Sequence, residues 1–309
     1  EISVCLVEKG AEVGSHILSG AVIDPVALSE LIPDWKEKGA PLNTKVTKDI
    51  FNLFSETRNL KIPHWLMPPI MSNKQNYIVS LGDLCVWLSK EAENLGIEIY
   101  PGFTAQEPIF NDNQELVGIL TGDMGRDSDG NETVNYAAGI EIRAKYSLIA
   151  EGTRGSITKI IEKKLSLRKN SDPQKYGLGF KEVWRLDKNK HHPGLVEHSL
   201  GWPLENDTGG GSFTYHYGED LVSLGFVVHL DYSNPYLSPF DEFQSFKTHP
   251  KIKNLLAGAK RISYGARAIN EGGIQSWPEL AFPGGVLIGC SAGMVNVPRI
   301  KGTHNAMKS

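Results

Sequence analysis

The sequence has few cysteines, and their arrangement offers no place for a metal. Cys5, Cys85 and Cys290 are the only three, and they lie far apart and form no CxxC pair. This spacing excludes a conventional zinc or iron–sulfur site built from this chain's cysteines. We expect reduced thiols that are mostly buried.

Basic blocks, aromatic–basic stripes and a recognisable signal or transit peptide are also missing. The net charge is −4, and without a basic patch nucleic acid is not expected as a partner. The chain has 309 residues, of which 40% are hydrophobic and 22% are charged. These proportions indicate a folded chain with one large or two modest domains.

Glycine, by contrast, is abundant, and residues 281–309, AFPGGVLIGCSAGMVNVPRIKGTHNAMKS, are rich in it. The pattern predicts an apolar strand, a Gly/Cys/Ser turn and a helix that begins near Gly302. Glycines let backbone N–H groups approach phosphate and ribityl groups closely. The positive end of the helix suits the N1/C2=O edge of a flavin, where negative charge collects on reduction. The alternative is a buried strand followed by an ordinary loop and helix.

The first residues support a dinucleotide cofactor. ISVCLVEK, residues 2–9, is an apolar run that ends near Glu8 and is followed by Gly10, like the second strand of a dinucleotide-binding unit. An acid in this position accepts hydrogen bonds from the adenosine ribose, and a phosphate-binding glycine turn precedes it by about 20 residues. We therefore expect the first strand and its glycines to lie outside this sequence. Alternatively, Glu8 only carries a charge to solvent.

Local patterns predict an α/β chain. Leu84, Leu88, Ala92 and Leu95 share one face of a helix over 81–95 that ends at Gly96. Strands are expected over 97–100, 107–110, 116–120, 139–143 and 146–150, with a polar turn at 127–131 and a helix over 157–164. Strand, helix, strand, small antiparallel meander and strand together indicate a Rossmann-type cofactor domain of the flavin class.

The character of the sequence changes near Leu165. LGFKEVWRL, GGSFTYHY and LVSLGFVVHL, between residues 177 and 230, are alternating runs typical of a sheet. We predict a FAD-binding domain over 1–164 that resumes over 261–309, with a β-rich domain inserted over 165–260, which the family resemblance described next implies to be a quinone-binding domain.

Several long strings carry a family resemblance. They are EKGAEVGSHILSGAVIDP, PDWKEKGAPLNT, GWPL, GGSF, DYSNPYLSPF, YGARAINEGG and the glycine-rich end. They span essentially the whole chain, which resembles the electron-transfer flavoprotein:ubiquinone oxidoreductases.

The resemblance implies an FAD enzyme that takes electrons from reduced electron-transfer flavoprotein and passes them to ubiquinone. It also implies peripheral attachment to a bacterial inner or mitochondrial inner membrane, as part of a respiratory chain. The family's [4Fe–4S] cluster has its four cysteines in a segment beyond the end of this chain. The resemblance therefore leads us to expect an interior fragment whose activity alone is in doubt.

Positioning residues rather than acid–base groups are implied, since the cofactor carries out the chemistry; no catalytic side chain and no metal ligand is assigned. The residues expected to bind FAD are Glu8, Ser19, Gly20, Ala21, Asn270, Gly289, Cys290, Gly302 and Thr303. For Thr303 the alternative is a helix cap, and for Asn270 a turn.

Backbone groups of Gly210 and Gly211 are expected to bind the quinone headgroup, because the absent side chains let a flat ring approach. Gly209 departs from the aromatic residue that the resemblance leads us to expect beside them. The alternative is a glycine-rich hairpin turn.

LKIPHWLMPPIM, residues 60–71, is apolar and rich in proline. Twelve residues are too few to span a bilayer, which takes about 20. Trp and Pro suit a segment that dips into one leaflet, with Trp65, Leu66, Met67 and Ile70 as the contacts. A buried loop is the alternative.

Two other function classes remain open. One is a sister FAD reductase, of the geranylgeranyl-reductase or nitrogen-fixation electron-transfer type, and the other is an inactive fragment. Cys290 stands where flavin monooxygenases usually have Asp, which favours electron transfer over oxygen activation by analogy. The histidines are not spaced as a metal set.

Overall fold

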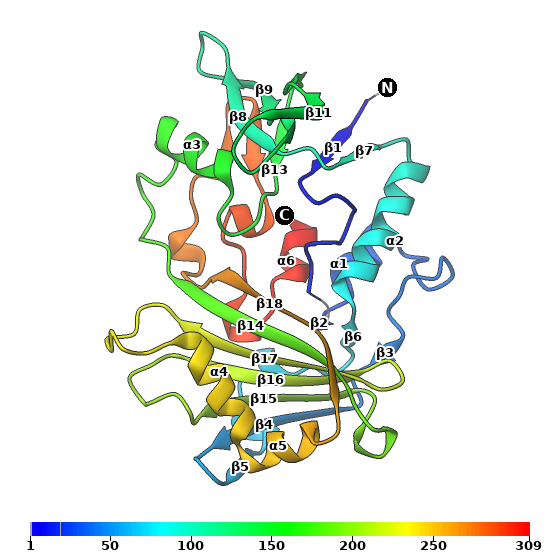
Figure 1. The fold of residues 1–309 in the computed structure, drawn as a ribbon, viewed down its shortest axis with the longest axis vertical. Helices are drawn as coiled ribbons and strands as arrows, with labels where there is room; N and C mark the ends of the chain where they lie inside the picture. Colours follow the sequence, from blue (N-terminus) through cyan, green and yellow to red (C-terminus); the bar gives the residue numbers. More distant parts are fainter. Residues whose placement is uncertain (1, 19) are drawn as a thin grey trace.

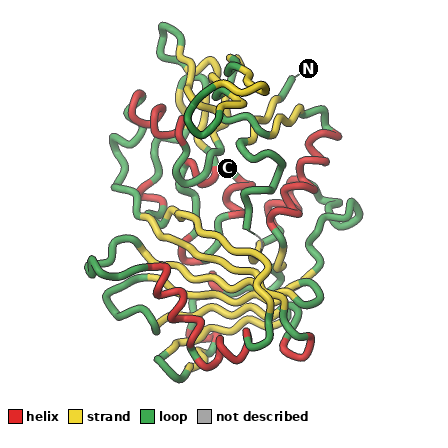
Figure 2. The backbone as a smooth tube through the Cα atoms, viewed as in Figure 1, coloured by secondary structure: helices red, strands yellow, loops and turns green. Residues whose placement is uncertain are grey.

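The computed structural model describes residues 2–18 and 20–309, which form two stacked parts (Figures 1 and 2). A broad sheet makes up the lower part of the view, and smaller sheets with most of the helices make up the upper part. Both ends of the chain lie in the upper part (Figure 1).

The broad sheet has seven strands in the order β18-β14-β17-β16-β15-β4-β5. Their bounds are β4 (Lys48–Phe54), β5 (Asn59–Ile62), β14 (Tyr176–Arg185), β15 (Leu195–Gly201), β16 (Gly210–Tyr217), β17 (Leu221–His229) and β18 (Lys260–Asn270). All neighbours are antiparallel except β15 and β4, which run parallel. The predicted strands over 177–230 are confirmed as β14, β16 and β17.

One face of this sheet is covered by α4 (Pro239–Thr248) and α5 (Pro250–Leu256) (Figure 1). Ser238 caps α4 by accepting from the N–H of Asp241, and Pro239 occupies the first turn. Phe243 and Phe246 point from α4 onto Phe226 and, with Ile252 of α5, form a buried aromatic core. This core holds α4 and α5 against the sheet.

The opposite face meets a small sheet of β2 (Ala21–Ile23), β6 (Tyr77–Val79) and β3 (Thr44–Lys45). Val22 and Ile78 pack against Val196 and Tyr215 of the broad sheet. The other side of the small sheet packs on α1 (Val26–Leu31) and α2 (Leu81–Asn94). The helix predicted over 81–95 is confirmed; Ser80 caps it.

Parallel strand pairs mark the cofactor-domain part. β1 (Cys5–Glu8) pairs with β7 (Glu98–Pro101), and β13 (Ser147–Ile149) pairs with β20 (Gly285–Leu287). On its other side β20 pairs antiparallel with β19 (Ala281–Phe282). The meander consists of β8 (Ala105–Phe110), β9 (Leu116–Thr121) and β12 (Glu141–Arg143). The strands predicted from the sequence are confirmed within a few residues.

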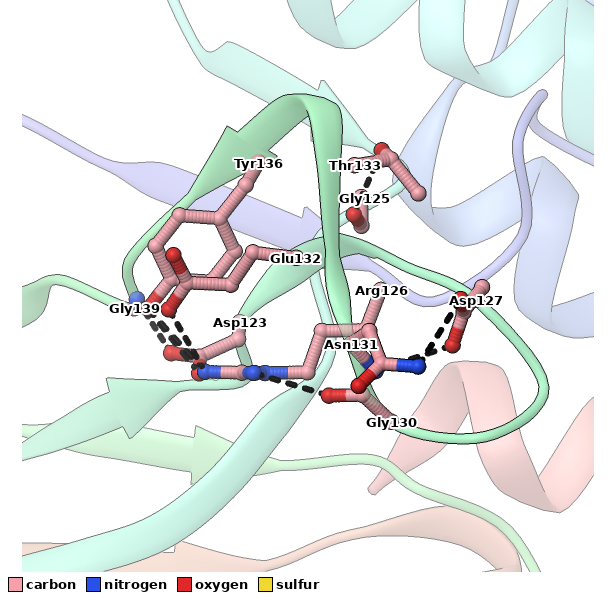
Figure 3. Close-up of polar contacts among 10 residues, drawn as sticks. All are labelled: Asp123, Gly125, Arg126, Asp127, Gly130, Asn131, Glu132, Thr133, Tyr136 and Gly139. Atoms are coloured by element: carbon pink, nitrogen blue, oxygen red, sulfur yellow. Dashed lines mark hydrogen bonds and ion pairs between the residues drawn. The ribbon is translucent and has the colours of Figure 1, made fainter.

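A polar hairpin, β10 (Met124–Arg126) and β11 (Glu132–Ala137), is inserted in the meander (Figure 3). The Asp127 carboxylate accepts the N–H groups of Asp129 and Asn131, which forms the polar turn predicted over 127–131. Asp123 accepts from the N–H of Gly139 and from the guanidinium of Arg126, and both hydrogen bonds lower the pKa of its carboxyl group. Hydrogen bonds rather than a hydrophobic core therefore hold this hairpin.

Glu151 joins β13 to α3 (Ser156–Lys164). Its carboxylate accepts the N–H groups of Ser156 (3.1 Å), Ile157 (3.3 Å) and Thr158 (2.7 Å) and the Thr158 hydroxyl (2.7 Å). A carboxylate at the start of a helix satisfies amides that have no partner within the helix and also meets the helix dipole. One side chain thus fixes the turn.

We expect the substitution Glu151→Ala to lower the free energy of unfolding by about 2 to 4 kcal/mol, because several charge-assisted hydrogen bonds are lost at once. Chemical denaturation of both proteins measures the difference. Glu56→Ala, an exposed glutamate between β4 and β5, is the control and should cost less than about 0.5 kcal/mol. A loss for Glu151→Ala as small as the control's would contradict this role.

The sheet does not follow the predicted domain limits closely. Strands β4 and β5, and all of β18 except Lys260, lie outside residues 165–260, yet they form both sides of the same sheet. The division into 1–164, 165–260 and 261–309 stays a prediction. The broad sheet itself is built from three separate parts of the chain.

Candidate functional site

The glycine-rich end folds into β20, a 3-10 turn η5 (Gly289–Ser291) and α6 (Thr303–Lys308). The helix predicted near Gly302 is confirmed, with Gly302 as its N-cap. The N–H of Gly289 donates to Ser309 Oγ (2.9 Å), so η5 lies against α6. Burial raises the pKa of the neighbouring Cys290 thiol. The region formed by η5 and α6 therefore holds Gly289 and Cys290 near the C-terminal end of the helix and Gly302 and Thr303 at its start.

Buried polar atoms without a partner lie beside this region. Asn270 is the last residue of β18 and is almost fully buried, yet its Oδ1 has no hydrogen-bond partner among the described residues; the same holds for Gln174 Nε2. Both amides face Gly293, in the loop after η5. Unsatisfied buried groups are costly. A free acceptor on one of these amides and a free donor on the other therefore fit a polar-edged group such as a flavin ring.

The loop before α6 is positively charged and tightly held. Arg299, in η6 (Val297–Arg299), pairs with Asp24 at 2.8 Å, and the buried Lys301 donates to the carbonyl of Arg299 at 2.9 Å. Burial, together with Arg299, lowers the pKa of Lys301 to about 8. Burial opposes ionisation of Asp24, but hydrogen bonds from the N–H of Val26 and from Arg299 outweigh it and lower that pKa.

Burial and the charge of Arg299 also act on α6, the helix beside this loop. Burial first, and then Arg299, lower the pKa of His304, whose Nδ1 has no partner among the described residues. The start of α6 is therefore a buried site with excess positive charge.

Gly20 and Ala21 lie between the two parts of the molecule. The carbonyl of Gly20 accepts a hydrogen bond of 2.9 Å from Lys181 Nζ of β14, and Ala21 begins β2. Burial lowers the pKa of Lys181 to about 8. Lys181 thus ties the Gly20 backbone to the sheet. Ser19, predicted beside them, lies outside the described residues.

Glu8 ends β1, as predicted. Its Oε1 accepts the N–H of Gly10 at 2.6 Å, which closes the turn after the strand. The carboxylate therefore has a structural partner, and its second oxygen is not used in that contact. Whether Glu8 binds a ribose stays a prediction.

Gly210 and Gly211 are the first residues of β16, not part of a hairpin turn. A Cβ on Gly211 would lie 2.5 Å from the carbonyl oxygen of Ser199 and 3.1 Å from Leu200 Cδ2. The close approach of β15 alone therefore requires glycine at position 211. This reason for the glycine was not visible in the sequence.

Gly209 has an equally local explanation. A Cβ at this position would collide with the imidazole of His229, and the backbone N–H of His229 donates to the carbonyl of Gly209 at 2.9 Å. The ring of His229 thus occupies the space that a side chain at position 209 would take. The sequence analysis missed this histidine, and the unexpected glycine was the only signal for it.

An apolar row runs from Gly211 to the sheet edge. Leu200 of β15 lies beside Gly211, Leu53 of β4 pairs with Leu200, and Leu60 of β5 pairs with Leu53. All three leucines are exposed. Leu60 is also the first residue of the segment 60–71, so the row ends at that segment.

The segment 60–71 continues from β5 into two 3-10 turns, η1 (His64–Leu66) and η2 (Pro69–Met71). His64 Nε2 lies 2.8 Å from the carbonyl of Asp49 and holds η1 on β4. Trp65 is 82% exposed, and Leu66 and Ile70 are also exposed, while Met67 is half-buried. η2 contacts η6, the turn before α6. The segment thus lies between the leucine row and the charged loop.

Within the described part of the chain, no helix is both long and apolar enough to cross a bilayer. No group of three or more histidine, cysteine or acidic side chains is placed to hold a metal ion there either.

Comparison with known proteins finds a family model similar to most of the broad sheet. Residues 176–269 match the family model "ETF-QO, ubiquinone-binding". The whole chain is 56% identical to electron transfer flavoprotein-ubiquinone oxidoreductase of Pseudomonas aeruginosa and covers 56% of it. It is 54% identical to the human mitochondrial protein of that name and covers 50% of it. The chain thus spans about half the length of these relatives.

Solved structures show the fold. A geranylgeranyl bacteriochlorophyll reductase-like protein from Thermoplasma acidophilum superimposes with a TM-score of 0.71 at 16% identity, over 99% of this chain and 69% of that one. The flavin-dependent brominase Bmp2, as a triple mutant, gives 0.68 at 14% identity, over 99% and 71%. The fold is therefore the α/β fold of FAD-dependent enzymes, as predicted.

Proposed function

The chain belongs to the electron transfer flavoprotein-ubiquinone oxidoreductase family, and from this premise we propose that it forms the FAD- and quinone-binding part of such an enzyme. The whole enzyme would take electrons from reduced electron-transfer flavoprotein and pass them to ubiquinone. The observation that carries the proposal is the match of residues 176–269 to the ubiquinone-binding family model.

The geometry supports a quinone site at Gly210 and Gly211. In this proposal the headgroup lies on the backbone near Gly211, and its isoprenoid tail follows Leu200, Leu53 and Leu60 to the sheet edge. An exposed aliphatic row suits an apolar tail.

FAD would lie between the broad sheet and α6. When bound, FAD takes up and releases electrons one or two at a time. Asn270 would hydrogen-bond the ring edge through its free Oδ1, and Thr303 and the Gly302–Thr303 backbone would face the pyrimidine end. Gly20, Ala21, Gly289 and Cys290 would contact the cofactor through small surfaces, Glu8 would hold the ribose, and Ser19 is proposed on resemblance alone.

The charged loop suits this arrangement. Arg299 and Lys301 place buried positive charge beside the start of α6, and the charges of Asp24, which pairs with Arg299, and of Asp49 offset part of it. Positive charge stabilises a neighbouring group that gains negative charge. This chain's residues would thus orient the cofactor, exclude water and ease its reduction.

Membrane contact is part of the proposal. Trp65, Leu66, Met67 and Ile70 would enter one leaflet, so that the leucine row opens into the lipid. A [4Fe–4S] cluster, if present in the whole enzyme, would be ligated by cysteines outside this chain.

Purified full-length protein tests the function. It should contain FAD, be reduced by reduced electron-transfer flavoprotein, and reduce a ubiquinone analogue. A colourless, flavin-free protein would refute the proposal. Reduction of isoprenoid double bonds in place of quinone would favour the sister reductases instead.

We expect Asn270→Ala to weaken FAD binding about tenfold, because one hydrogen bond to the cofactor, worth about 1 to 1.5 kcal/mol, is lost. Quenching of flavin fluorescence on titration into the apoprotein measures the dissociation constant. Asn131→Ala, in the exposed hairpin turn, is the matched control. Equal affinities for all three proteins would show that Oδ1 does not bind the cofactor.

A further inference from the structure

The side chains of His229 and Glu271 lie against each other on the face of the sheet that carries Gly211. His229 ends β17, Glu271 follows β18, and the strand between them, β14, has Gly177 at the crossing point. His229 Nε2 lies 3.4 Å from Glu271 Oε2. A Cβ on Gly177 would collide with the Glu271 carboxylate. The glycine therefore lets the carboxylate reach across β14 to the imidazole.

The pair lies next to the proposed quinone site. The imidazole fills the space over Gly209, with Nδ1 as its nearest atom, while Nε2 faces Glu271. Gly209 and Gly211 are two residues apart, so their Cα atoms are separated by no more than about 7 Å. A ring on Gly211 is therefore within reach of the Nδ1 side of His229.

We propose that His229 and Glu271 supply protons to the quinone as it is reduced. The inference rests on the proposed function, since it requires quinone at Gly211. The imidazole releases its Nδ1 proton to a quinone oxygen while Nε2 takes the proton of the Glu271 carboxyl group, which leaves a neutral imidazole and a carboxylate. Solvent then returns a proton to Nδ1 while Nε2 gives its proton back to the Glu271 carboxylate, so that a second transfer of the same kind can follow. The quinol would be complete with two protons from the pair and the two electrons that a bound flavin would supply.

Exposure and charge suit this role. The His229 side chain is 39% exposed and the Glu271 side chain 9%, so solvent can return protons through the histidine. Burial, and then the charge of Asp231, raise the pKa of Glu271 to about 7. A group that titrates near the working pH is the most effective proton donor.

The other charged groups near the pair do not replace it. Asp231 is bound to Lys175 at 3.2 Å, Arg154 lies over the ring of Tyr176 at 5.5 Å, and Asp207 accepts from the hydroxyl of Ser233. Of these, Asp231 is the one that acts on the pKa of Glu271.

The test is the pH profile of quinone reduction by the full-length flavoprotein, measured with a soluble short-chain ubiquinone between pH 5.5 and 9. The wild-type rate should be constant below about pH 7 and fall above it, because the carboxyl group loses its proton. Glu271→Gln should lower the rate at pH 6 roughly tenfold to a hundredfold and remove the fall. Asp231→Asn should move the fall to lower pH, since one negative charge near Glu271 is lost.

Reduction of the flavin by its protein donor should be unchanged in every variant, and Glu279→Gln, an exposed acid elsewhere, should match the wild type throughout. A second measurement is the infrared band of a protonated carboxyl group, which should titrate near pH 7 in the wild type and vanish in Glu271→Gln.

A wild-type pH profile in Glu271→Gln would overturn the inference even if quinone is reduced. If the wild type accepts electrons into its flavin but reduces no quinone at any pH, the proposed function fails together with it.

Discussion

Replacing Trp65 and Leu66 together by glutamate should release the full-length protein from phospholipid vesicles. Trp65 is 82% and Leu66 58% exposed, and both project from a turn that His64 holds on β4. Burying two such side chains in a leaflet contributes on the order of 4 kcal/mol, so the partition coefficient should fall about a thousandfold. Vesicle sedimentation over a range of lipid concentrations measures this.

The control separates a local contact from a general effect of charge. Val134 is fully exposed on the hairpin strand β11, far from the segment in Figure 1. Val134→Glu should bind vesicles like the wild type. If the double variant also binds unchanged, residues 60–71 do not enter the membrane, and the buried-loop interpretation is favoured.

Local structure followed from the sequence wherever neighbouring residues decide it. The helix over 81–94 has its apolar stripe, its Ser80 cap and its Gly96 stop within 17 residues, and strands β16 and β17 have the alternation that a half-buried sheet requires. No distant partner was needed for these predictions.

Strand partners could not be predicted in the same way. β4 lies parallel to β15, which is more than 140 residues further along the chain, and β18 pairs with β14 over its full length. The hydrogen-bonding edge of a strand carries no side-chain pattern that names its partner. The broad sheet therefore takes in strands that the sequence assigned to the cofactor domain.

In the candidate site, too, single residues could be predicted from the sequence, but their neighbours in space could not. Asn270 and the paired glycines were indicated by family strings, but their surroundings depend on cross-strand neighbours. Only the three-dimensional register places the ring of His229 over Gly209 and brings Glu271 across Gly177. The glycine at position 209, where an aromatic residue was expected, was the one sign of this arrangement in the sequence.

The leucine row gives the second large effect. Leu200 is exposed beside Gly211 and pairs with Leu53, so Leu200→Glu would place a carboxylate where the isoprenoid tail passes. Lost apolar contact and the cost of desolvating the charge together amount to about 3 kcal/mol, which should raise the KM for a long-chain ubiquinone roughly a hundredfold.

The measurement is steady-state quinone reduction alongside reduction of the flavin by its protein donor, which should be unaffected. Leu200→Met keeps the volume and apolar character and should retain the wild-type KM, while Leu31→Glu, an exposed leucine of α1, controls for added charge. Because Leu200 is already exposed, a glutamate there does not disturb the core, so equal loss of flavin and quinone reduction is not expected from unfolding. An unchanged KM in Leu200→Glu would mean that the tail leaves Gly211 by another route, and the membrane segment would then have to be placed anew relative to the sheet.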